Sequence, residues 1–224
     1  MKRVMGPALL LLAIAATAQA HFVFIVPPAK IGERTLTVVF SDSTEPDRNP
    51  KLLDKIAHTK FLAIDSRGKT RELKAARGKN ALRIEVDGKE PVDVVGICDY
   101  GVISKGKEPF RLTYCSRTSL GGGLVKAVDA DVLPLQIVLV ETKVAVRVQV
   151  LWQGKPLAGS EVVAVWGEKS EPVKTDEKGI AQLKAAEAGP IAVRASHIET
   201  KKGTHDGKAY ASVRYYATLV APGS

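Results

Sequence analysis

Short runs of alternating apolar and polar residues, separated by glycine-containing turns, dominate the chain after residue 20. This period of two is the pattern of half-buried strands. Gly-Lys pairs recur between the runs, where glycine permits a positive φ and lysine keeps an exposed strand edge soluble. We expect an all-β protein with strands near residues 21–26, 34–40, 60–64, 70–74, 81–86, 92–103, 110–115, 133–140, 145–152, 161–166, 180–183, 190–198 and 210–219.

Only one short helix is expected, at residues 51–57, where Asn49-Pro50 supplies a cap and a helix-starting proline. Strands at this spacing predict β-sandwich architecture. A linker at residues 121–131, which begins with Gly121-Gly122-Gly123, divides the chain. We therefore expect two immunoglobulin-like or transthyretin-like β-sandwich modules, at residues 21–120 and 132–224.

The first twenty residues have the features of a secretory signal peptide. Lys2 and Arg3 precede a short apolar stretch at residues 8–16, and Ala18-Gln19-Ala20 fits the small-x-small cleavage pattern. Cleavage after Ala20 makes His21 the first residue, whereas cleavage two residues earlier remains an alternative. The sequence thus predicts export to the periplasm or the cell surface.

Composition narrows the possible functions. Of 224 residues, 45% are hydrophobic and 25% charged, which is typical of a globular protein and excludes a disordered tail. No apolar run after the signal is long enough to span a bilayer, so we do not expect an integral membrane protein. Loss of Lys2 and Arg3 lowers the formal charge from +9 to +7. The basic residues are scattered over turns and strand edges, which argues against nucleic-acid binding.

Cys98 and Cys115 are placed symmetrically about the turn at residues 105–108. If the strands at residues 95–103 and 110–115 pair across this turn without a bulge, the two cysteines face each other within disulfide reach. Export favours oxidation. We therefore expect a Cys98–Cys115 disulfide that clamps a hairpin. A thiolate metal site is the less favoured alternative, because no second cluster of ligands lies nearby in sequence.

His21 is the most informative candidate for metal chemistry. At a mature N-terminus its free α-amine and its imidazole can chelate one ion, and these nitrogens suit copper(II) or nickel(II). His197 is the second candidate, since alternation places it and Glu199 on the same face as Val193 and Ala195 at a strand end. His58 and His205 are interpreted as solvent-exposed.

Several segments resemble an uncharacterised exported family. They are His21-Phe22-Val23-Phe24-Ile25-Val26-Pro27, residues 41–47 (SDSTEPD), residues 99–102 (DYGV), residues 195–199 (ASHIE) and residues 214–219 (RYYATL). The family is often labelled nickel-uptake substrate-specific or NikM-like, a periplasmic domain of unknown function. The resemblance implies two β-sandwich-like modules and transition-metal binding through the N-terminal His and a later His. Cys115 departs from it, because an aromatic residue is expected there.

Three functions remain open. The first is an exported nickel- or copper-binding protein that supports metal uptake, with a membrane transporter as its implied partner. Its ligands would be His21 and His197, with oxygen from Glu45, Glu199 or Asp206, and with Tyr216 and Tyr210 beside the ion. The second is a structural or adhesion module without metal. The third is a copper monooxygenase with an N-terminal histidine brace, although no catalytic motif is present.

Overall fold

The structure, a computed structural model, describes residues 21–30, 32–104, 108–121, 127–141, 145–165, 172–183 and 189–222. The predicted signal peptide at residues 1–20 lies outside these residues. Within them the protein is all-β, as the alternation predicts, with one short 3-10 helix, η1 (Pro50–Ile56). Asn49 caps η1 as expected, since its side chain accepts the backbone N–H of Lys51 at 3.2 Å.

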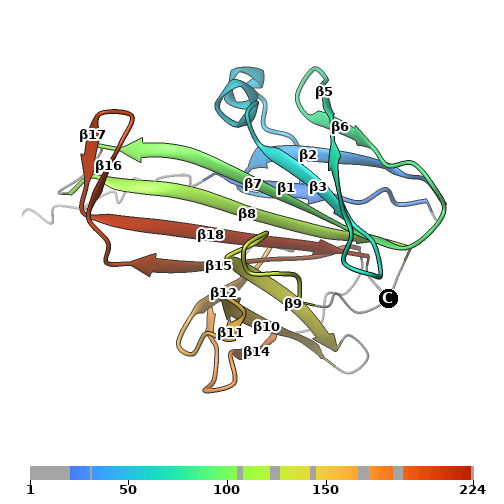
Figure 1. The fold of residues 1–224 in the computed structure, drawn as a ribbon. Helices are drawn as coiled ribbons and strands as arrows, with labels where there is room; N and C mark the ends of the chain where they lie inside the picture. The colour runs from blue at the N-terminus through green and yellow to red at the C-terminus, as the bar shows by residue number, and fades with distance from the viewer. Residues whose placement is uncertain are drawn as a thin grey trace, which may run out of the picture.

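Apart from one separate two-stranded hairpin, the strands form three stacked sheets (Figure 1). The first sheet has the order β1-β2-β6-β5. The central sheet has eight strands in the order β13-β12-β15-β18-β8-β7-β3-β4, and in the third sheet β10 pairs with β9, β11 and β14. The bounds are β1 (Phe22–Val26), β2 (Thr35–Ser41), β3 (Lys60–Ile64), β4 (Thr70–Leu73), β5 (Ala75–Arg77), β6 (Leu82–Glu85), β7 (Val92–Ile103), β8 (Phe110–Leu120), β9 (Leu135–Glu141), β10 (Val146–Trp152), β11 (Lys155–Pro156), β12 (Glu161–Ala164), β13 (Val173–Lys174), β14 (Ile180–Leu183), β15 (Ile191–Glu199) and β18 (Ser212–Ala221).

Two hydrophobic cores lie on opposite faces of the central sheet. Val94 belongs to the core under the first sheet, and its neighbour Val95 belongs to the core under the third sheet. In the same way, Tyr114 lies in the core under the first sheet and Cys115 lies in the core under the third sheet. Because neighbouring side chains of a strand point to opposite faces, both faces of this sheet are buried along much of its length. The first and third sheets therefore cover the two sides of one shared layer (Figure 1).

The two halves of the chain meet inside the central sheet. β18 pairs with β8 in parallel, from Ser212 opposite Phe110 to Val220 opposite Thr118. Thr218 of β18 also donates its hydroxyl to the Val23 carbonyl of β1 at 2.6 Å. Both expected sandwiches are present, but they share this sheet. Residues 122–126 of the expected linker lie outside the described residues.

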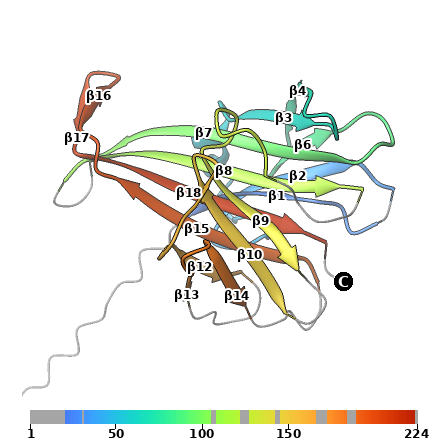
Figure 2. The same ribbon diagram turned by 60° about the horizontal axis from the view of Figure 1, so that its bottom comes forward.

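Strand β8 continues five residues beyond the predicted end at Cys115, through a polar segment. Arg117 is only 1% exposed there, and it pairs with Asp93 of β7 at 2.8 Å and with Gln136 of β9 at 3.3 Å. These partners allow a charged side chain to lie between two sheets. The predicted last strand, in contrast, is broken at Ala211: Tyr210 belongs to the separate hairpin of β16 (Gly203–His205) and β17 (Lys208–Tyr210), which projects from the end of the sheet (Figure 2).

The predicted Cys98–Cys115 disulfide is wrong, because both cysteines are free. Near the turn the strands have the expected register, with Gly101 opposite Leu112. An irregularity between Asp99 and Gly101 then shifts the pairing by one residue, so that Cys98 faces Tyr114. A shift of one residue reverses the face of every later side chain. Cys98 consequently lies in the core under the first sheet, and Cys115 lies in the core under the third.

This arrangement predicts two free thiols. Protein unfolded in denaturant without reductant is expected to take up two alkyl groups, one at each cysteine, when its mass is measured. The native protein is expected to react far more slowly, since Cys98 and Cys115 are each only 1% exposed. An unfolded sample that takes up no alkyl group would contradict the structure and restore the disulfide.

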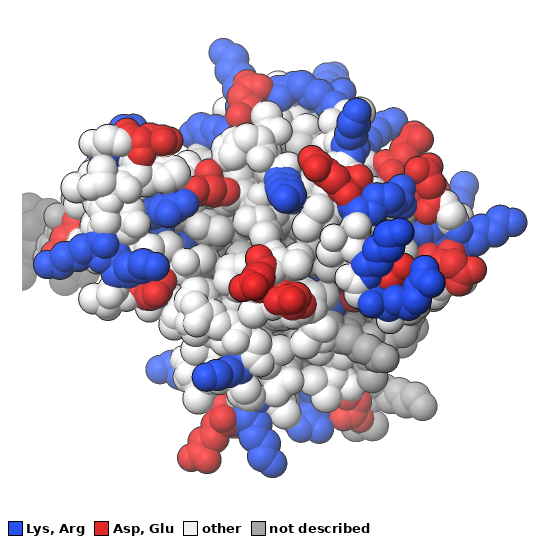
Figure 3. Space-filling view, in the orientation of Figure 1, with Lys and Arg blue, Asp and Glu red and all other residues white. Residues whose placement is uncertain are grey.

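The surface carries charges of both signs. Lys and Arg alternate with Asp and Glu over the face drawn in Figure 3 rather than gathering in one patch. No helix among the described residues is long and apolar enough to cross a bilayer.

Candidate functional site

His21 lies immediately before β1, at the edge of the first sheet. Its ring packs against Phe40 of β2, with centroids 5.4 Å apart. Its backbone carbonyl accepts the Tyr114 hydroxyl at 3.0 Å. The side chain is 21% exposed. Strand β8 and strand β2 thus hold the residue in place while its ring still reaches solvent.

Asp47 is the charged partner of His21. The His21 Nε2–H donates to Asp47 Oδ2 at 3.0 Å, while Asp47 Oδ1 accepts the backbone N–H of Asn49 at 2.7 Å. The Asn49 N–H and the His21 ring together lower the pKa of the Asp47 carboxyl, which therefore stays ionised. With its proton on Nε2, the ring keeps the lone pair of Nδ1 free. Nδ1 is the nitrogen nearer to the backbone and to the α-nitrogen.

His197 lies in β15, opposite Tyr215 of β18. Its ring contacts Trp152 of β10, with centroids 4.4 Å apart, and the Trp152 ring in turn contacts Tyr215 at 4.6 Å. Burial lowers the pKa of His197, while the negative charge of Glu199 opposes this shift. His197 and Glu199 therefore lie close together, as expected. The rings of His197, Trp152 and Tyr215 form an aromatic cluster at the end of the core under the third sheet.

The structure does not bring His21 and His197 together. His21 packs on Phe40, in the core under the first sheet, whereas His197 packs on Trp152 and Tyr215, on the third-sheet side. The central sheet separates them. Because metal–nitrogen bonds are about 2 Å long, one ion cannot bind two imidazoles on opposite faces of a sheet. The shared His21–His197 site expected from the sequence is inconsistent with this geometry, and so is the alternative histidine brace built from the same two residues.

The other predicted ligands are dispersed. Glu45 is exposed, and Asp206 is 87% exposed in the turn of the β16–β17 hairpin. Tyr216 stacks on Tyr114 at 6.0 Å, on the His21 side of the sheet, whereas the separate hairpin places Tyr210 beside Arg111. Among the described residues, no group of three or more His, Cys, Asp or Glu could hold a metal ion.

The two histidines expected in solvent both make contacts. His205 is 25% exposed and lies 3.6 Å from Asp99, so it is less exposed than predicted. His58 is exposed, as predicted, but its Nε2 lies 2.8 Å from the backbone carbonyl of Asp99 and 3.6 Å from Cys98 Sγ. Burial raises the pKa of the Cys98 thiol, and a hydrogen bond with the Thr59 side chain partly offsets this rise.

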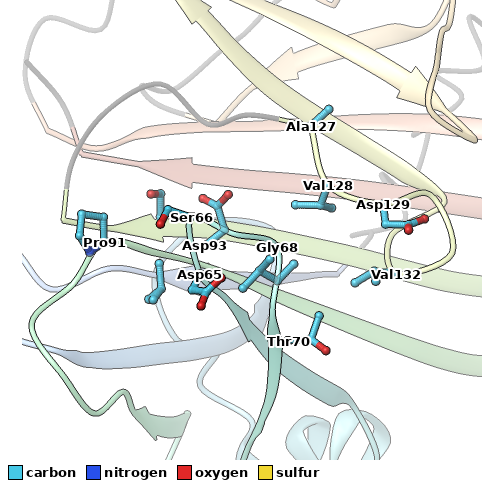
Figure 4. A pocket seen from close by; sticks show the side chains of 13 residues that line it. Asp65, Ser66, Gly68, Thr70, Pro91, Asp93, Ala127, Val128, Asp129 and Val132 are labelled. Atoms are coloured by element: carbon cyan, nitrogen blue, oxygen red, sulfur yellow. The ribbon is translucent and has the colours of Figure 1, made fainter.

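A cavity of about 430 Å³ lies away from all of these residues, where the β3–β4 turn meets the segment after residue 126 (Figure 4). Asp65, Asp93 and Asp129 line it. Each is already engaged: Asp65 accepts backbone N–H groups of its own turn, Asp93 binds Arg117, and Asp129 accepts the Asp131 N–H. These carboxylates stabilise turns and a buried arginine.

Comparisons with known proteins give little further guidance. No family model matches the chain, and no curated protein matches it. One solved structure that aligns with it is described as a tetra-tandem repeat in the extending region of a large adhesion protein, with 12% identity and a TM-score of 0.26. The alignment covers 91% of this chain and 49% of that one, so this chain spans about half the length of its structural neighbour.

Asp47 is the site residue that sequence reasoning missed. Residues 41–47 belong to the segments that resemble the exported family, but the predicted oxygen ligand in this segment is Glu45 and not Asp47. A usable signal was present, because Asp47 stands two residues before Asn49, the spacing of an Asx turn at the start of a helix. Such a turn fixes the carboxylate, and the loop after β2 then brings it to His21.

Proposed function

We propose that this protein is an exported metal-binding protein in which the processed N-terminal residue, His21, chelates copper(II) or nickel(II). The observation that carries the proposal is the 3.0 Å hydrogen bond from His21 Nε2 to Asp47. It leaves Nδ1 available. After cleavage at Ala20, Nδ1 and the new α-amine can bind one ion together, and both are nitrogen donors that these metals prefer.

Asp47 has the role that carboxylates usually have beside a metal-bound histidine. A carboxylate that accepts the second ring N–H fixes the tautomer and the orientation of the ring and makes it a better ligand. Asp47 is well suited to this role, because its other oxygen is held by the Asn49 N–H and its side chain is 30% exposed. The ring orientation is therefore established before any ion arrives.

The proposed site supplies two nitrogen ligands, which is fewer than a permanent structural site uses. Water or a partner would complete the coordination. Such an incomplete site is suited to an ion that is bound and passed on, which agrees with metal uptake through a membrane transporter. His197 has no part in it. Chelation by one N-terminal residue also needs no catalytic constellation, so we propose binding rather than monooxygenase chemistry.

Calorimetric titration with copper(II) tests the proposal. Protein beginning at His21 is expected to bind one equivalent, and His21→Ala or protein whose His21 α-amine is acetylated is expected to lose this phase, because each lacks one of the two nitrogens. Asp47→Asn is expected to weaken binding by about 10- to 100-fold. Glu45→Gln is the matched control, since Glu45 is exposed and in the same loop, and it is expected to bind like the wild type.

Equal affinity in the protein with the acetylated α-amine would contradict chelation by the N-terminus. Absence of any stoichiometric metal from correctly processed protein would instead favour the structural or adhesion module. Nickel(II), titrated in the same series, identifies which of the two metals the site prefers.

A further inference from the structure

A second pair of metal-binding side chains lies where the chain leaves η1 and meets β7. His58 follows η1, and Cys98 lies in β7 with its thiol on the first-sheet side. Cys98 Sγ and His58 Nε2 are 3.6 Å apart although they are 40 residues apart in sequence. Cys98 is 1% exposed, whereas His58 is exposed, so the pair joins a buried thiol to an imidazole at the surface.

We propose that Cys98 and His58 bind a zinc-like divalent cation, independently of the His21 site. In tetrahedral zinc sites the Zn–S bond is about 2.3 Å and the Zn–N bond about 2.0 Å, which puts the two ligand atoms about 3.5 Å apart. The observed separation is 3.6 Å. The two atoms are therefore already spaced as neighbouring ligands of one tetrahedral ion.

Oxygen donors surround the pair. The backbone carbonyl of Asp99 lies 2.8 Å from His58 Nε2, and the Thr59 side chain bonds with the Cys98 thiol. Zinc accepts sulfur, nitrogen and oxygen ligands, and exchangeable sites complete their coordination with water. Binding would release the thiol proton, and the proton that Nε2 donates to the Asp99 carbonyl would be exchanged through solvent for one on Nδ1, so that a thiolate and a neutral imidazole are the ligands.

Cys115 provides an internal comparison. It is equally buried, but it lies on the opposite face of the central sheet, in an apolar core. Burial raises the pKa of its thiol to about 12. The same chain thus holds one thiol beside an imidazole and one thiol in apolar surroundings, and only the first has the geometry of a ligand.

Cobalt(II) is the appropriate probe, because it replaces zinc and a cobalt–thiolate bond gives a charge-transfer band in the near ultraviolet. Reduced full-length protein is expected to show this band at one equivalent of cobalt(II) and to lose it when zinc is added. Cys98→Ser and His58→Ala are expected to lower the band at least tenfold. Cys115→Ser, the matched control, is expected to keep it.

The His21→Ala variant separates this site from the proposed function, since it is expected to keep the cobalt–thiolate band while losing the copper chelate. Alkylation provides a second readout in wild-type protein, because zinc is expected to protect Cys98 from a thiol reagent and to leave Cys115 unaffected. The proposal is overturned if folded wild-type protein shows no cobalt–thiolate band, or if Cys98→Ser retains it.

Discussion

Replacement of Asp93 by alanine is expected to lower the free energy of unfolding by about 3 kcal/mol, measured by urea denaturation. Arg117 is 1% exposed and donates from Nη2 to Asp93 Oδ2 at 2.8 Å. Burial lowers the pKa of Arg117, while Asp93 opposes this shift. Removal of the carboxylate takes away a negative charge that stabilises a guanidinium between two sheets, and this costs more than an exposed ion pair contributes.

Asp87→Ala is the matched control for this prediction. Asp87 also pairs with an arginine, Arg71, at 3.1 Å, but the two side chains are 89% and 47% exposed. Its removal is expected to change stability by less than about 0.5 kcal/mol. If the two alanine variants unfold at the same urea concentration with the same slope, burial of Arg117 does not govern the strength of its pair.

Gly179→Ala is expected to destabilise the protein by about 3 kcal/mol in the same measurement. Gly179 has φ of +71°, and a Cβ there would lie 2.6 Å from the Val150 carbonyl oxygen and 2.9 Å from the Leu157 nitrogen. Both are backbone atoms that cannot move aside without disturbing β10 and the turn beside it. The variant therefore combines a strained backbone conformation with a steric clash.

Gly207→Ala isolates the first of these two effects. Gly207 has almost the same φ, +73°, but no atom lies within 4 Å of the position of its Cβ. Its replacement is expected to cost only the left-handed strain, about 1 kcal/mol. Equal losses for the two variants would show that the close approach of β10 to Gly179 is absent in solution.

The elements of the fold followed from the sequence wherever alternation was strong. The predicted bounds of β7 and β14 agree with the structure, and Asn49 caps η1 as expected. Strand β8 was predicted too short because Arg117 and its polar neighbours resemble a strand end. Their burial depends on Asp93 and Gln136, which come from other strands and leave no local signal.

The candidate site was predictable only in part. Cleavage after Ala20 selects His21 from local sequence features, but its partner Asp47 depends on the path of a loop. The face of Cys98 depends on the single-residue irregularity near Tyr100, which alternation does not reveal. Likewise, the separation of His21 from His197 follows from the layer order of the sheets, a long-range property that strand patterns do not specify.

The parallel pairing of β18 with β8 has a consequence for the order of synthesis. One edge of β8 has no neighbour until Ser212–Ala221 has been made, about a hundred residues later. Contacts so distant in sequence form slowly, and an open strand edge invites wrong pairing in the meantime. The growing chain therefore cannot complete its middle layer early. The central sheet is completed only when β18 joins it.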